Sequence, residues 1–210
     1  MGAFFLVLEG PEGAGKSTLT RALAERLRVQ GLDPIVVREP GGTPVAEALR
    51  AELLSADRGW TPEAELLYMC AARADLVAKV IRPALDAGRI VLSDRYELST
   101  WAYQMKGRGL PEAQVHWVNQ AATGGLRPDL TLVLDLPADA GRARQVAAGK
   151  TGDRLDRESP AFHARVAEAY RSAAGPGIEH LDASVSPEEL LAAAWAVLQA
   201  RGALASGAAR

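Results

Sequence analysis

Residues 10–17, Gly-Pro-Glu-Gly-Ala-Gly-Lys-Ser, match the complete P-loop pattern, which strongly limits how this chain can fold. The apolar run 4–8 predicts a buried strand before the loop, and leucines at 19, 23 and 27 predict a helix over 17–29 after it. In this arrangement the glycines turn backbone N–H groups toward an anion, and the helix N-terminus adds its positive dipole end. The chain is therefore expected to bind a nucleoside triphosphate.

Within this loop each residue type has an expected task. Lys16 would contact the β- and γ-phosphates, and Ser17 would offer its hydroxyl to Mg²⁺. Asp94 ends a third apolar run, 90–93, and a carboxylate in that place helps hold Mg²⁺. We therefore expect Ser17 and Asp94 to form a metal site, with the phosphates bound by Gly10, Pro11, Glu12, Gly13, Ala14, Gly15, Lys16, Ser17 and Thr18.

Composition excludes several other classes of protein. The 24 Lys and Arg residues are balanced by 26 Asp and Glu residues, so the chain has no overall basic field for nucleic acid. No apolar stretch reaches the roughly 18 residues that span a bilayer, and the N-terminus lacks the features of a signal peptide. The only cysteine, Cys70, can form no internal disulfide and is expected to be a small buried residue. These features indicate a cytoplasmic protein.

Further apolar runs at 34–37, 130–135 and 178–182 alternate with helical patterns. Parallel strands need crossover connections, so the sequence predicts an α/β fold of the three-layer P-loop NTPase type, with a five-stranded, mostly parallel sheet flanked by helices. We expect one P-loop domain over 1–201 and a frayed tail over 202–210. The polar segment 147–156 is either a plain surface loop or part of a lid over about 142–156.

Three arginines suggest a second phosphate-bearing ligand. Arg38 and Arg95 follow the second and third strands, at the edge where α/β sheets bind ligands. Arg73 lies beside the buried face of a long helix that begins at 61–63 and is ended by Gly88, and a cation there needs an anion. A salt bridge to Glu65 or Asp75 would satisfy it, and so would a ligand phosphate. If the three converge, they exceed what one triphosphate requires, which favours a nucleoside monophosphate as acceptor.

Six segments, 8–18, 38–43, 71–73, 94–104, 127–135 and 153–154, resemble the bacterial thymidylate kinases. The resemblance implies ATP-dependent conversion of dTMP to dTDP with Mg²⁺, usually in a homodimer. It also implies that three arginines bind the dTMP phosphate, the third bridging donor and acceptor, and that Glu12 approaches the 3′-hydroxyl. Tyr103 would crowd the 2′ position and Thr100 and Gln104 would face the base. The implied dTMP-binding residues are Glu12, Arg38, Met69, Arg73, Arg95, Thr100, Tyr103 and Gln104.

Two departures from the family pattern concern the base and the lid. Met69 stands where the family usually has a phenylalanine that stacks on thymine, and Gly13 stands where one class has a P-loop arginine. The resemblance therefore implies a catalytic cation supplied by the lid. Arg144 is preferred for this role and Lys150 is second, beside Lys16 and Arg95 as catalytic residues. Arg154 is also a candidate, or else a structural partner of Asp153 or Asp156.

Other functions remain as alternatives. A deoxynucleoside kinase would share the fold but would need a carboxylate base, for which Glu39 or Glu97 could serve. A regulatory GTP-binding switch would need an Asn-Lys-x-Asp segment, which the sequence lacks. An inactive nucleotide-binding module would be expected to lack Lys16 or Arg95, and both are present.

Overall fold

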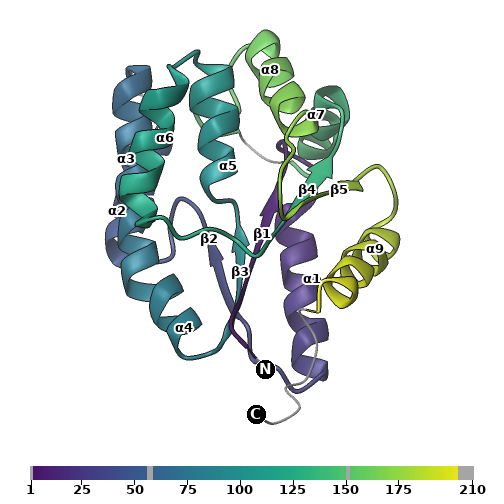
Figure 1. The fold of residues 1–210 in the computed structure, drawn as a ribbon. Coiled ribbons are helices and arrows are strands. Elements are labelled where there is room, and N and C mark those ends of the chain that lie inside the picture. The colour runs from purple at the N-terminus through teal and green to yellow at the C-terminus, as the bar shows by residue number, and fades with distance from the viewer. Residues whose placement is uncertain (1, 56–58, 150–151, 203–210) are drawn as a thin grey trace.

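The computed structural model describes residues 2–55, 59–149 and 152–202, and its centre is one five-stranded sheet (Figure 1). The spatial order of the strands is β2-β3-β1-β4-β5, and all four pairings between neighbours are parallel. This confirms the predicted fold class. The strands are β1 (Phe4–Glu9), β2 (Ile35–Arg38), β3 (Ile90–Asp94), β4 (Leu130–Asp135) and β5 (Ile178–Asp182).

Helices connect the strands and cover both faces of the sheet, as the parallel pairing requires. In the described part of the chain they are α1 (Lys16–Val29), α2 (Pro44–Leu54), α3 (Pro62–Leu76), α4 (Arg82–Asp86), α5 (Glu97–Thr100), α6 (Glu112–Thr123), α7 (Ala138–Ala147), α8 (Pro160–Arg171) and α9 (Pro187–Ala200). Two π-helical segments, Val77–Ile81 and Trp101–Gly107, continue α3 and α5. None of the described helices is long and apolar enough to cross a membrane.

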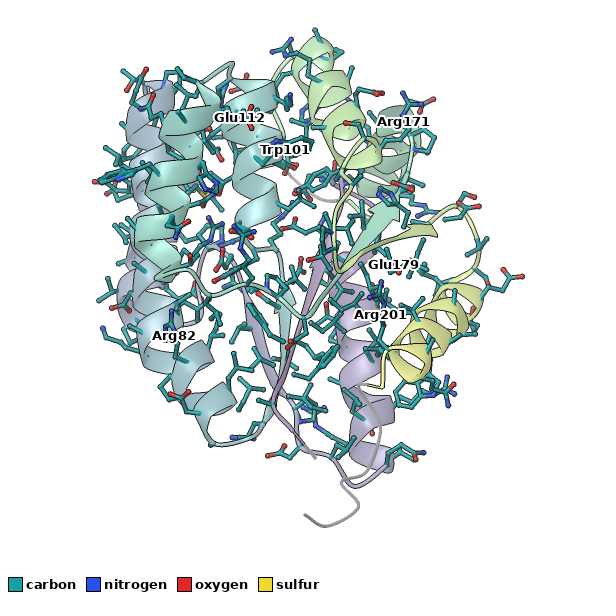
Figure 2. The ribbon with its side chains drawn as sticks, in the orientation of Figure 1. Arg82, Trp101, Glu112, Arg171, Glu179 and Arg201 are labelled. Carbon is teal, nitrogen blue, oxygen red and sulfur yellow. The ribbon has the colours of Figure 1, made fainter. Side chains whose placement is uncertain are left out.

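Strand β1 contributes side chains to both hydrophobic layers. Leu6 and Leu8 pack with α1 and α9 on one face, and Phe5 and Val7 pack with α3 and the π-helical segment 77–81 on the other. All four are at most 1% exposed. Figure 1 shows α1 and α9 on one side of the sheet and α3, α4 and α6 on the other, and Figure 2 shows side chains filling both layers. A continuous apolar run is therefore needed here, because neither face of the strand meets water.

The carboxyl ends of β1, β2 and β3 meet at one edge of the sheet. Leu8 and Arg38 are each the register partner of Asp94. The P-loop, the loop 39–43 and the turn at Arg95 therefore leave the sheet side by side, as the sequence predicted. This edge holds the candidate site.

Candidate active site

The P-loop wraps around the start of α1. The backbone φ values of Gly10, Gly13 and Gly15 are 140°, 77° and 92°, and residues other than glycine rarely adopt such values. Lys16 is 7% exposed, and its Nζ donates to the carbonyls of Gly10 and Pro11 at 2.9 and 2.8 Å. Burial lowers the pKa of Lys16 to about 8, and the nearby positive charge of Arg95 acts in the same direction. The ammonium group still carries its charge at neutral pH.

The two residues expected to hold Mg²⁺ are in direct contact. The Ser17 hydroxyl donates to Oδ2 of Asp94 at 2.5 Å. Hydroxyl and carboxylate oxygens are ligands that Mg²⁺ accepts, and this ion usually completes its shell with phosphate oxygens and water. Within residues 2–55, 59–149 and 152–202, no group of three or more His, Cys, Asp and Glu side chains could hold a metal ion. The side-chain oxygens of Ser17 and Asp94 have the chemistry that a magnesium ion accepts.

Two pockets adjoin at this edge. The P-loop cleft is lined by the loop itself and by Arg38, Asp94 and Arg144, among others. The inner pocket extends away from the loop and is lined by residues that include Met69, Arg73, Thr100, Tyr103 and Gln104. Five side chains line both pockets and so mark the passage between them: Glu12, Glu39, Arg50, Arg95 and Asp153.

Arg95 occupies this passage in an unusual backbone conformation, with φ of 79°. Its Nη2 pairs with Glu12 and lies 3.3 Å from the Tyr103 hydroxyl. Burial alone would lower the pKa of Arg95, but the fields of Tyr103 and Glu12, together with other acidic neighbours, raise it well above the ordinary value. A permanent positive charge therefore faces both pockets.

Arg73 is 2% exposed and makes a buried ion pair with Glu39, with Nε 2.6 Å from Oε2. Its Nη1 donates to Thr100 at 2.8 Å and to Asn119 at 2.5 Å. The prediction that Arg73 forms its ion pair with Glu65 or Asp75 is therefore wrong. The acid that Arg73 uses comes from a loop 34 residues earlier in the chain.

Both of those acids are used elsewhere. Glu65 accepts from Arg108 and Arg154 at 2.8 and 2.7 Å. Asp75 pairs with Lys79 and accepts from the Thr43 hydroxyl at 2.5 Å. Neither carboxylate is therefore the anion that Arg73 requires.

Glu39 has a second notable property. Its Oε1 is buried and has no hydrogen-bond partner among the described residues, and burial raises the pKa of this carboxyl to about 7.

Arg38, next to Glu39 in the chain, is half exposed and pairs with Glu47 of α2 at 2.9 Å. The three arginines thus divide between the pockets: Arg73 lines the inner one, Arg38 lines the P-loop cleft and Arg95 lines both.

The residues expected to face a base lie together in the inner pocket. Met69, Thr100 and Gln104 line it, and Gln104 donates from Nε2 to Oε1 of Glu65 at 2.8 Å. Tyr68, next to Met69, instead packs edge-on against Trp60, with ring centroids 4.3 Å apart. Met69 is thus the residue of this pair that lines the pocket.

The cations of the segment 142–156 point in different directions. Arg144 lines the P-loop cleft and donates to the Ala183 carbonyl at 2.9 Å. Arg154 donates to the Leu53 carbonyl and to Glu65, so its predicted partners, Asp153 and Asp156, are wrong. Lys150 lies outside the described residues, and so do residues 203–210 of the predicted tail.

Gly13 meets a second glycine across the loop. A Cβ added at Gly13 would lie 2.2 Å from the Gly141 carbonyl, and a Cβ added at Gly141 would lie 2.2 Å from the Glu12 carbonyl. The first turns of α7 therefore pack directly on the P-loop backbone. No side chain fits at either position unless the backbone moves.

Some residues of the site were missed by the sequence analysis. Arg50 lines both pockets and donates to the Pro40 carbonyl at 2.9 Å, and burial lowers its pKa. Its place on the helix after the loop 38–43 is the signal that could have found it. Tyr170 contacts Arg95 at 3.0 Å, and no local pattern points to it, because it lies 75 residues away.

Comparisons with known proteins agree with this geometry. A family model described as thymidylate kinase matches residues 8–194. The chain is 50% identical over 208 residues to the thymidylate kinase of Cereibacter sphaeroides, covering 94% of this chain and 96% of that one. It is 48% identical over 199 residues to that of Thermomicrobium roseum, covering 93% and 94%. The crystal structure of thymidylate kinase from Ehrlichia chaffeensis superposes with a TM-score of 0.77 at 27% identity, covering 95% of this chain and 99% of that one.

A parallel sheet with a P-loop at its edge and an arginine-lined second pocket defines a phosphotransferase of the nucleoside monophosphate kinase class. With the family model matched over most of its length, the chain belongs to the thymidylate kinase family. The comparisons do not support the deoxynucleoside kinase or the GTP-binding switch.

Proposed function

We propose that this thymidylate kinase transfers the γ-phosphoryl group of Mg-ATP to dTMP, with ATP in the P-loop cleft and dTMP in the inner pocket. The observation that carries this assignment is the position of Arg95, whose guanidinium lines both pockets. A single charge there can contact both the attacking and the transferred phosphates. Transfer between two phosphates needs such a group, because negative charge accumulates between them.

In this assignment the remaining residues share two tasks. Lys16 and the backbone N–H groups of 10–18 bind the ATP phosphates, and Arg144 balances charge on the transferred group. Ser17 and Asp94 would hold Mg²⁺, which supplies positive charge to the β- and γ-phosphates when bound. Lys150 stays a candidate for the second lid cation.

On the acceptor side, Arg73 and Arg38 bind the dTMP phosphate together with Arg95. Tyr103 and Glu12 lie beside the deoxyribose. Thr100 and Gln104 face the thymine, with Met69 against the ring, where its thioether offers a polarisable surface. All of these side chains except Arg38 line the inner pocket, and Arg38 reaches the phosphate from the adjoining P-loop cleft.

No strong base is required, since the attacking phosphate oxygen is already anionic. The chain contributes alignment and neutralisation of charge, and an arginine in this role is worth about 10³–10⁵ in rate. Closure of the 142–156 segment over the cleft would exclude water and limit hydrolysis of ATP.

The test is ADP release with Mg-ATP and each candidate acceptor in turn: dTMP, dUMP, the ribose form of TMP, dCMP, AMP, GMP and thymidine. Turnover on dTMP that exceeds turnover on all the others supports the assignment. Equal turnover on dCMP would contradict the assigned base contacts, and turnover on thymidine alone would contradict the phosphate-binding role of the arginines.

Two substitutions test the roles of the charged groups. Lys16→Ala and Arg95→Ala should each reduce turnover below detection while the thermal unfolding transition persists. A folded Arg95→Ala enzyme with near-normal kcat would remove Arg95 from the mechanism.

We further propose that the enzyme is a cytoplasmic homodimer. Leu67 of α3 and Trp117 of α6 are 56% and 71% exposed on neighbouring helices, which favours contact with a second copy of this face. Sedimentation of the wild-type chain beside Trp117→Lys should distinguish dimer from monomer. A wild-type chain that sediments as a monomer at micromolar concentration would contradict the proposal.

A further inference from the structure

Glu9 is a buried carboxylate that the roles above do not use. It is the last residue of β1, directly before the P-loop, and it is 0% exposed. Its Oε1 accepts from the backbone N–H groups of Tyr96 and Ser99 at 2.8 and 3.0 Å. Its Oε2 accepts from the hydroxyls of Ser99 and Tyr170 at 2.6 and 3.1 Å. A carboxylate removed from water needs such donors.

These donors fit the ionised form of Glu9. Burial raises the pKa of the carboxyl, and Arg95 and the hydrogen bonds from Ser99, Tyr96 and Tyr170 offset only part of that effect. Four donors surround the two oxygens, and a protonated oxygen would turn a donor of its own toward one of them. In the ionised form, Glu9 accepts from all four of these donors.

The direction of the next hydrogen bonds follows from this. A hydroxyl has one proton to donate and two lone pairs that accept. Because a guanidinium can only donate, the oxygens of Ser99 and Tyr170 accept from Nη1 of Arg95, which lies 3.1 and 3.0 Å away. The protons of the two hydroxyls are then left for Oε2 of Glu9 and for the contact between the hydroxyls themselves, which are 2.9 Å apart. Glu9 thus holds both hydroxyls in the orientation that meets the guanidinium.

Arg95 needs this support. It is a non-glycine residue at φ of 79°, a conformation that persists only when its surroundings impose it. Its long side chain would otherwise retain several rotamers. Glu12, its partner on the pocket side, is 37% exposed at the side chain, so the buried contacts come from the other side.

We propose that Glu9 is a positioning residue that acts through the hydroxyls of Ser99 and Tyr170 to hold the Arg95 guanidinium between the two pockets. This rests on the proposed role of Arg95 in phosphoryl transfer. The two oxygens of Glu9 have separate tasks, since Oε1 binds the first turn of α5 and Oε2 orients the hydroxyls.

Two variants remove the Oε2 contacts. Glu9→Gln keeps an acceptor for the backbone N–H groups but turns an NH₂ group toward the hydroxyls. Tyr170→Phe removes one hydroxyl and retains the ring. We expect kcat to fall about 100-fold in Glu9→Gln and about 10-fold in Tyr170→Phe, in line with the loss of hydrogen bonds to a charged group. KM for ATP should stay within about twofold, because the P-loop contacts are intact.

Tyr96→Phe is the matched control. It removes the hydroxyl of another fully buried tyrosine, which donates to the Leu126 carbonyl and does not contact Arg95. The backbone N–H of residue 96, which donates to Glu9, is retained. The kcat of Tyr96→Phe should stay within about twofold of wild type. Its unfolding temperature should fall by about as much as that of Tyr170→Phe. This comparison separates loss of orientation from loss of stability.

A double-mutant cycle supplies the second readout. The lysine ammonium is a compact point charge that lacks the planar fork through which the guanidinium donates to the two hydroxyls, so Tyr170→Phe should change kcat by less than about twofold in an Arg95→Lys background. A full 10-fold loss in that background, or wild-type kcat in Tyr170→Phe while Arg95→Ala is inactive, would overturn the positioning role alone. If Arg95→Ala itself is active, the proposed function of Arg95 fails instead. Should Glu9→Gln not fold, Tyr170→Phe and the cycle still decide the question.

Discussion

Glu39 and Arg73 join the loop after β2 to helix α3 through a fully buried ion pair, with Oε2 and Nε 2.6 Å apart. Their side chains are 4% and 2% exposed. Such a pair gains little over apolar packing, but removal of one partner leaves the other as an uncompensated buried charge. The pair therefore fixes one wall of the inner pocket.

Glu39→Ala should reduce the free energy of unfolding by about 3–5 kcal/mol, because it leaves the Arg73 charge buried and unpaired. Urea unfolding followed by circular dichroism measures this. Glu179→Ala is the control, since Glu179 of β5 pairs with Arg201 at the surface, where both are about 40% exposed (Figure 2). That change should cost less than about 1 kcal/mol. Equal costs for the two variants would contradict the importance of burial.

Arg144 and Arg154 should respond differently to substitution. Arg144 lines the P-loop cleft, so Arg144→Ala should lower kcat by about 10³ or more with little change in unfolding temperature. Arg154 pairs with the buried Glu65, so Arg154→Ala should mainly lower the unfolding temperature. Steady-state kinetics and thermal melts of both variants check this, and the reverse pattern would assign the catalytic cation to Arg154.

Gly141→Ala should destabilise the enzyme even though it lies within a helix. Alanine in a helix is ordinarily favoured over glycine by about 1 kcal/mol. Here the added Cβ would meet the Glu12 carbonyl at 2.2 Å, so α7 or the P-loop must shift. We expect a lower unfolding temperature and a higher KM for ATP. Gly59→Ala has open space around it and is the control; a stabilised Gly141→Ala enzyme would contradict the close contact.

His180 gives the stability a specific pH dependence. Its Nδ1 lies 2.9 Å from Asp135 and its Nε2 lies 2.7 Å from the Ala173 carbonyl, and both partners can only accept. Burial would lower the pKa of His180, but these two acceptors raise it. Because folding raises the pKa of His180, the protonated imidazole stabilises the folded state. This contribution to the free energy of unfolding is present in full below about pH 6.5 and is lost as pH rises through the folded-state pKa of His180.

The advantage of wild type over His180→Gln in unfolding free energy should therefore be constant between about pH 5.5 and 6.5 and should decrease at higher pH. Urea titrations of both proteins across this range measure it. An advantage that grows with pH would mean that His180 is neutral in the folded state.

Ser17→Ala tests the metal site. Activity should disappear with EDTA and return with Mg²⁺ in the wild-type enzyme. Because the variant loses one oxygen ligand, it should need more Mg²⁺ for half-maximal activity. A titration of Mg²⁺ at fixed ATP gives both values, and identical requirements would exclude the hydroxyl as a ligand.

The sequence was sufficient for the sheet and for the residues at its edge, because both depend on local patterns. Apolar runs predicted all five strands, and the spacing of the glycines before Lys16 and Ser17 marked the P-loop. The contacts between distant segments were not accessible in this way. Glu39 meets Arg73 across 34 residues, and Glu9 meets Tyr170 across 161. Charge alone suggested nearer acids for Arg73, and only the packing of α3 against the loop after β2 decides between them.

The contact between Gly13 and Gly141 also limits how this enzyme could evolve. An arginine at position 13 would have to displace the backbone of α7, which carries Arg144. A lineage that gains a side chain at position 13 would therefore also move Arg144, which lines the same cleft. A remodelled α7 is required before the P-loop can carry an arginine there.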